Sequence, residues 1–205
     1  MISDEIRLGL PIRSFDDAAA FDLWLSVEPR NSAGIWLMIA KKGASARGVS
    51  KRDAIDAALC HGWIDGQQHP YDGEFWLTRF TPRRPASLWS QVNRTRVGEL
   101  MAAGRMLCAG LTQIQAAKSD GRWDAAYAPA STAEPSAELL AALAAVPYAA
   151  NSFSSLRRSE RYAIMHRLNN LKTSAGHTRA IRQTVDMLVG RAAAVAAASS
   201  PKSSD

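Results

Sequence analysis

The segment from Phe75 to Gly98 combines arginines with aromatic residues and contains no acidic residue. A planar guanidinium group can hold a carboxylate or phosphate through two parallel hydrogen bonds, and it can also stack on an aromatic ring. The segment therefore predicts recognition of a small anion. Its five arginines are Arg79, Arg83, Arg84, Arg94 and Arg96, and its interleaved aromatic residues include Trp76, Phe80 and Trp89.

We hypothesise that a single cleft collects these groups at one edge of a small sheet. A carboxylate from the preceding strand, the arginines and the first turns of the following helix would meet there, and free N–H groups at a helix N-terminus favour anions. The alternative is a structural network, in which Asp65 pairs with an arginine and fixes the hairpin without any ligand. The predicted lining is Asp65, Trp63, Arg79, Arg83, Trp89, Ser90, Asn93 and Lys42.

The stretch ALCHGWIDGQQHP, residues 58–70, contains other reactive side chains. Gly62 occupies the position of a glycine that ends a helix, so Cys60 and His61 fall in the last helical turn. The negative end of the helix dipole disfavours a thiolate there, and we interpret Cys60 as a packed structural thiol rather than a nucleophile. Nothing beyond Asp65 suggests a general base, so no catalytic residue is assigned.

Metal and cofactor chemistry are not predicted. His61, Asp65 and His69 are evenly spaced, but the chain has no H-x-x-x-H or C-x-x-C motif. Neither a phosphate-binding glycine loop nor a dinucleotide fingerprint is present. We therefore expect no metal and no cofactor.

The elements that must position the cleft follow from hydrophobic periodicity and capping residues. The pattern predicts helices over about 15–27, with Ser14 as its cap, and over 50–61, with Ser50 as its cap. The apolar run 34–42 predicts a buried strand. Asp72-Gly73 predicts a two-residue hairpin turn, which pairs Asp65 with Phe80 and Gln67 with Thr78. Further helices are expected at about 87–104, 109–119, 136–145, 148–155, from 159 onward, and 177–195.

These elements predict an α+β fold rich in helices. A small antiparallel sheet with helices would occupy residues 1–125, and a linker would cover 126–137. An α-helical region over 138–195 and a disordered tail over 196–205 would complete the chain.

Three stretches, ALCHGWIDG, RFTPRRPASLWSQVN and GRMLCAG, together resemble the bacterial YdeI/OmpD-associated family, also described as bacteriocin-protection. The resemblance covers about residues 14–190. It implies a small α+β protein with a helical C-terminal part and a role in tolerance to bacteriocins or envelope stress. It implies no known reaction, so we expect an accessory or binding protein rather than a defined enzyme.

Charge and composition leave two other functions open. Residues 151–205 carry nine basic and three acidic side chains, which accounts for the net charge of +6. The basic C-terminal helices could contact nucleic acid, and the arginine–aromatic cleft could instead serve a small-molecule enzyme. The N-terminus MISDEIRLGLPIRS has acidic residues and no long apolar run, and the chain has two cysteines, so we expect a soluble cytoplasmic protein without a membrane span.

Overall fold

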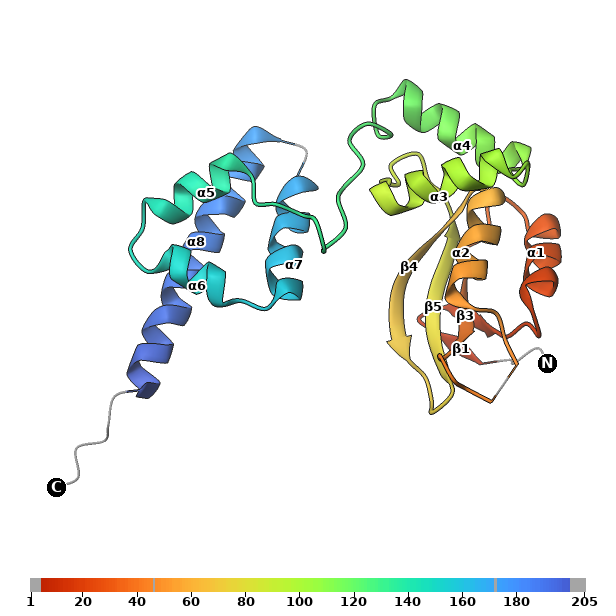
Figure 1. The fold of residues 1–205 in the computed structure, drawn as a ribbon, viewed down its shortest axis with the longest axis horizontal. Coiled ribbons are helices and arrows are strands. Elements are labelled where there is room, and N and C mark those ends of the chain that lie inside the picture. The colour runs from red at the N-terminus through yellow and green to blue at the C-terminus, as the bar shows by residue number, and fades with distance from the viewer. Residues whose placement is uncertain (1–4, 46, 172, 200–205) are drawn as a thin grey trace. The chain divides into compact units, whose positions relative to one another are not determined.

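The computed structural model describes residues 5–45, 47–171 and 173–199. The chain divides into two compact units, Met1–Ala126 and Tyr127–Asp205, which we call the N-terminal unit and the C-terminal unit (Figure 1). The first contains a five-stranded sheet with helices and the second is helical, so the predicted α+β class is confirmed.

The sheet of the N-terminal unit has the strand order β1-β2-β3-β5-β4. It is mixed rather than purely antiparallel as expected, because β2 and β3 run parallel. The helix α1, Ala18–Val27, joins these two strands and carries the chain back to the end from which it started, as a parallel pair requires. The strands are β1 (Ile6–Arg7), β2 (Leu10–Arg13), β3 (Ile35–Ala40), β4 (Trp63–Pro70) and β5 (Phe75–Pro82).

Two capped helices cover one face of this sheet (Figure 1). Asp17 caps α1 by accepting a hydrogen bond from the N–H of Ala20 at 2.8 Å, so the cap is Asp17 and not Ser14. Ser50 caps α2, Lys51–Cys60, as predicted, accepting from the N–H of Asp53. Apolar residues from both helices and the sheet form one buried core: Phe21, Leu25, Ile35, Leu37, Ile39, Val49, Ala54, Ala57, Ala58, Trp63 and Phe80.

The β4–β5 hairpin confirms the pairing of Asp65 with Phe80 but not that of Gln67 with Thr78. A bulge after Asp65 shifts the register, so that Gln68 lies opposite Thr78. The turn is also longer than the predicted two-residue loop, because residues 71–74 separate β4 from β5. The Asp72 carboxylate holds this turn by accepting hydrogen bonds from the N–H groups of residues 74 and 75.

The helices α3, Gln91–Ala102, and α4, Cys108–Ser119, complete the N-terminal unit. The helix α4 crosses close to the end of α2, where a Cβ added to Gly110 would lie 2.5 Å from the carbonyl oxygen of Leu59. Gly62 ends α2 with a φ of +75°, and a Cβ there would lie 2.9 Å from the carbonyl oxygen of Ala109. These two glycines allow the close contact between the helices.

The C-terminal unit consists of helices around a core of its own. Its elements are close to the predicted ranges, and the helical backbone extends further than expected, to Ser199. The remainder of the predicted tail, 200–205, lies outside the described residues. In the described parts of both units, no helix is long and apolar enough to cross a bilayer. The helices are α5 (Ala137–Ala144), α6 (Ala149–Ser155), α7 (Arg158–Asn169) and α8 (Ser174–Ser199).

Candidate functional site

Arg83 and Trp89, two members of the predicted cleft, form a closed stack. The guanidinium carbon of Arg83 lies 3.5 Å from the centre of the indole, and its Nη1 donates to the carbonyl oxygen of Leu88 at 3.1 Å. Arg83 is 6% exposed and Trp89 is 2% exposed, so water scarcely reaches either group. Trp123 packs edge-on against Trp89, with 4.9 Å between the ring centres. The stack holds the loop before α3 in place.

Ser90 and Asn93 follow this stack in the chain and form the N-terminal cap of α3. The hydroxyl of Ser90 accepts a hydrogen bond from the N–H of Asn93 at 3.1 Å and thereby caps α3. Both side chains are buried. Trp63 is buried as well, and together with Arg83 it lines a hollow of only about 60 Å³, which is smaller than ordinary ligand pockets.

Asp65 and Arg79 lie on opposite faces of the sheet. Asp65 is paired with Phe80, whose side chain belongs to the core under α1 and α2, whereas Arg79 is the neighbour of Phe80 in β5 and points the other way. Burial raises the pKa of Asp65, and the positive charges of Lys51 and Arg83 offset part of that effect. The structure therefore does not bring this carboxylate and Arg79 into one hollow.

Lys42 lies at the other end of the sheet from Arg83. It follows β3, whose last residue, Ala40, is paired with the first residue of β5, Phe75. Arg83 follows the last residue of β5. The eight predicted residues are thus divided among a sealed stack, two faces and two ends of the sheet.

Sequence reasoning missed the buried acidic partner of Arg96, an arginine that also pairs with the exposed Glu99. Asp56 of α2 is 2% exposed, and both of its carboxylate oxygens accept hydrogen bonds from Arg96 of α3. Arg105 approaches the same carboxylate at 3.5 Å. The one available signal was the position of Asp56 among the apolar residues of α2, where a charge requires a partner.

Cys60 and His61 occupy the end of α2 as predicted. Burial raises the pKa of the Cys60 thiol, which disfavours a nucleophilic thiolate. The His61 Nε2 lies 3.1 Å from a carboxylate oxygen of Asp22 and so links α1 to α2. The described residues contain no group of three or more His, Cys, Asp or Glu side chains arranged to hold a metal ion.

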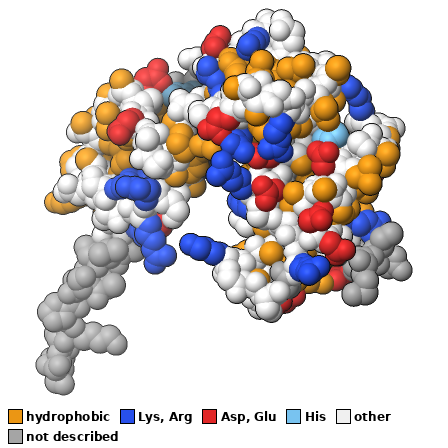
Figure 2. Space-filling view, turned by 45° about the vertical axis from the view of Figure 1, so that its right-hand side comes forward, with side chains coloured by type: hydrophobic (Ala, Val, Ile, Leu, Met, Phe, Trp, Pro, Cys, Tyr) orange, Lys and Arg blue, Asp and Glu red, His pale blue; other side chains and the backbone are white. Residues whose placement is uncertain are grey.

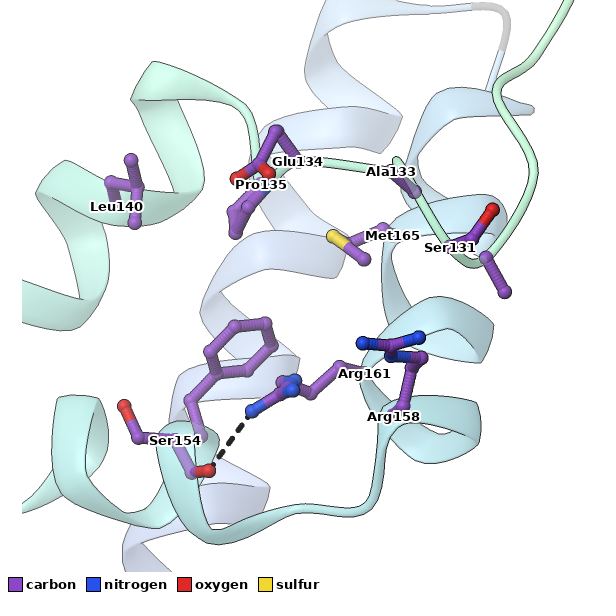
Figure 3. Close-up of a pocket in the computed structure, with 11 residues that line it drawn as sticks. Ser131, Ala133, Glu134, Pro135, Leu140, Ser154, Arg158, Arg161 and Met165 are labelled. Carbon is purple, nitrogen blue, oxygen red and sulfur yellow. Dashed lines mark hydrogen bonds between the residues drawn. The ribbon is translucent and has the colours of Figure 1, made fainter.

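The best candidate site is a pocket in the C-terminal unit (Figure 3). Its volume is about 400 Å³, within the range of small-molecule sites. Segment 130–135, the end of α6 and the first turns of α7 form its walls. Its lining residues are Ala130, Ser131, Ala133, Glu134, Pro135, Leu140, Phe153, Ser154, Arg158, Arg161 and Met165.

Two arginines supply the positive charge of this pocket. Arg158 and Arg161 extend from α7 into the region that Met165 also borders (Figure 3), and Phe153 is a further apolar lining residue. The Nη1 of Arg161 donates to the carbonyl oxygen of Ser154 at 3.0 Å, which fixes the guanidinium without neutralising it. Within the described residues, neither arginine forms an ion pair.

The two acidic residues in and near this pocket, Glu134 and Glu160, differ in their contacts. Glu160 accepts a hydrogen bond from the N–H of Arg157 at 2.8 Å and another from Arg191 at 3.1 Å. These contacts lower the pKa of Glu160, with the backbone N–H the larger cause. Glu134 lines the pocket itself. One carboxylate and two guanidinium groups leave the lining with a net positive charge.

The sequence contained a signal for this pocket. Arg158 and Arg161 are three residues apart, which places them on the same face of a helix. The basic character of the C-terminal helices allows contact with nucleic acid, whereas in the structure these two side chains line a concave pocket. The face shown in Figure 2 has basic, acidic and apolar side chains mixed together.

Comparison with known families finds one match within each of the two units. Residues 13–113 match the family described as "Domain of unknown function (DUF8412)", and the three stretches that suggested the resemblance lie within this match. Residues 132–190 match the family described as "Bacteriocin-protection, YdeI or OmpD-Associated", and this match includes most of the pocket lining. No curated protein and no solved structure gives a significant match. The similarity to the bacteriocin-protection, YdeI or OmpD-associated family therefore lies in the C-terminal unit, over residues 132–190.

Proposed function

We propose that this protein is a non-enzymatic binding protein whose C-terminal unit holds a small carboxylate with an apolar body. The observation that carries the proposal is the pocket of about 400 Å³ in which two arginines face apolar side chains. This arrangement replaces the cleft that the sequence suggested around Arg83, because that arginine is buried against the indole of Trp89.

The pocket offers each part of such a ligand a matching surface. A carboxylate can accept two parallel hydrogen bonds from one guanidinium group, and Arg161 is held ready by Ser154. Phe153, Met165 and Leu140 present apolar surface for an alkyl or aryl body. Glu134 on the same lining would repel a ligand with several negative charges, which favours a monoanion.

The biological setting is a further part of the proposal. The description of the matched family supports a role in tolerance to bacteriocins or related stress. Cys60 and Cys108 are both free thiols, which supports a reducing compartment such as the cytoplasm. In this setting the ligand would act as a signal or cargo rather than as a substrate.

The test is calorimetric titration with hexanoate, and with 1-hexanol as a probe of the same chain length without the charge. We expect hexanoate to bind the full chain at one site, and 1-hexanol to bind at least about tenfold more weakly because it cannot accept charge-assisted hydrogen bonds. The double variant Arg158→Ala/Arg161→Ala should weaken hexanoate binding by at least about tenfold.

A matched control is available on α8. Arg179 and Arg182 are exposed, three residues apart and absent from the pocket lining, so Arg179→Ala/Arg182→Ala removes the same charge from the same unit. This control should bind hexanoate with unchanged affinity. Absence of hexanoate binding, equal binding of 1-hexanol, or equal weakening by the control pair would each overturn the proposal.

A further inference from the structure

The second face of the sheet, opposite α1 and α2, carries a separate apolar cluster centred on Trp36. Trp36 is 1% exposed and Leu77 is fully buried, although the cluster contains no residue from a helix. Its members are Leu10, Ile12, Trp36 and Leu77, with Met38 packed against them. Cationic side chains border this cluster.

The first of these cations is Arg7. The indole Nε1 of Trp36 donates to the carbonyl oxygen of Arg7 at 2.9 Å, which fixes β1 beside the ring. The guanidinium carbon of Arg7 lies 5.7 Å from the ring centre, within the range of a cation–π contact. The hydroxyl of Tyr71 donates to Glu5 at 2.7 Å and ties the start of β1 to the hairpin turn.

The second cation is Arg79, and an imidazole lies beside the same ring. Arg79 pairs with Trp36 across β3 and β5, so the two side chains leave the sheet on the same face. The ring of His69 lies edge-on to Trp36, with 5.4 Å between the ring centres. Three nitrogen-bearing side chains from β1, β4 and β5 therefore surround one indole.

Both guanidinium groups have donors that nothing in the described protein satisfies. The Nε atoms of Arg7 and Arg79 are buried and have no hydrogen-bond partner. Neither arginine forms an ion pair with a described carboxylate. A partly desolvated guanidinium without a counter-charge is unfavourable. An anion on its outer nitrogens would supply that charge, although it would not reach the buried Nε atoms.

We infer that Arg7, Arg79 and His69 form a phosphate-binding site on the sheet face around Trp36. The site lies in the N-terminal unit, and it does not depend on the carboxylate pocket proposed for the other unit. A tetrahedral phosphate group has enough acceptor oxygens to engage two guanidinium forks and an imidazole N–H together. The site would hold inorganic phosphate or the phosphate group of a small phosphorylated molecule.

The indole N–H signal of Trp36 provides a local readout. The chain has six tryptophans, and Trp36→Phe identifies the relevant cross-peak in a ¹H–¹⁵N spectrum of the full chain. Titration with inorganic phosphate at constant ionic strength should shift this peak to saturation. Glucose 6-phosphate distinguishes a phosphorylated ligand, which should bind more tightly than inorganic phosphate, from a site for the free ion, where it should bind more weakly.

Arg7→Gln and Arg79→Gln should each weaken phosphate binding by about tenfold or more. Arg52→Gln is the matched control, because Arg52 is an exposed arginine on α2, at the opposite face of the sheet, and its loss should leave binding unchanged. If Arg79→Gln fails to fold, Arg79→Lys keeps the charge without the planar fork and should still weaken binding measurably.

Three results would overturn the inference. The first is a Trp36 signal that does not saturate with phosphate. The second is equal weakening by Arg52→Gln and by Arg79→Gln. The third is an equal saturating shift with acetate at the same ionic strength, which would assign the face to carboxylates instead of phosphates.

Discussion

Arg83 in the N-terminal unit and Arg161 in the C-terminal unit show two uses of the same side chain. Each donates a hydrogen bond to a backbone carbonyl, at 3.1 Å and 3.0 Å. Arg83 is nevertheless closed in by Trp89, whereas Arg161 lines a pocket of about 400 Å³. The carbonyl bond orients both groups, and only the surroundings decide whether a ligand can reach the charge.

The contrast predicts that substitutions at Arg83 mainly lower stability, whereas substitutions at Arg161 mainly lower ligand binding. Removing a sealed arginine or its aromatic partner disrupts packing and leaves buried polar atoms unsatisfied. An arginine that lines an open pocket can be solvated when it loses a contact, so its removal should mainly affect binding. The two sites can therefore be distinguished by unfolding experiments.

The largest expected effect is that of Trp89→Ala. Trp89 is 2% exposed and contacts both Arg83 and Trp123, so its removal leaves a cavity and uncovers a buried guanidinium. We expect a loss of about 3–5 kcal/mol in the free energy of unfolding, measured by urea denaturation. A loss below about 1 kcal/mol would show that the stack is not closed and would remove the contrast.

A smaller effect is expected from the same substitution at the two sites. Arg83→Met keeps the side-chain length but loses the hydrogen bond to Leu88 and the cation–π contact, so we expect a cost of about 2–3 kcal/mol. Arg161→Met loses one partly exposed hydrogen bond and should cost about 1 kcal/mol or less. Urea denaturation of the two variants checks the difference, and equal costs would contradict the comparison.

The smallest effect is expected at Asp65, with the opposite sign. Burial raises its pKa, so the folded protein holds the proton more tightly than the unfolded chain does. Its contribution to stability is favourable at low pH and is lost as the pH rises from the ordinary carboxyl pKa through the raised value. Asp65→Asn should therefore raise the melting temperature at pH 7.

The gain from Asp65→Asn should shrink as the pH falls below the ordinary carboxyl pKa, because Asp65 is then neutral in both states. Melting curves of the two proteins from pH 3 to pH 8 measure this difference. A lower melting temperature for Asp65→Asn at pH 7 would instead place Asp65 in a stabilising ion pair, as the structural-network alternative required.

Much of the fold was predictable because its signals are local. The caps, end glycines and apolar spacing located the helices to within a few residues, as Ser50 and Gly62 show. Strand register was less predictable, because the bulge after Asp65 depends on how β4 fits its partner strand. The short strands β1 and β2 lacked a clear pattern and were missed.

The structure does not gather the predicted site residues in one place, because residues close in sequence can lie on different faces and ends of the sheet. The pairing of Asp65 with Phe80 was right, and the same pairing places Arg79 on the other face of the sheet. The acidic partner of Arg96 was missed because Asp56 lies forty positions away. Arg158 and Arg161 were visible as a pair on one helix face, but not as part of a pocket.

The sequence by itself determined approximately where the helices lie and that the strand over 34–42 is buried. These features depend on backbone capping and on the spacing of apolar side chains within one segment. Only the tertiary structure decided which arginine is buried against an indole ring and which arginines line an open pocket. The physical reason is that burial and hydrogen-bond partners are set by residues distant in the chain, which the fold brings into contact.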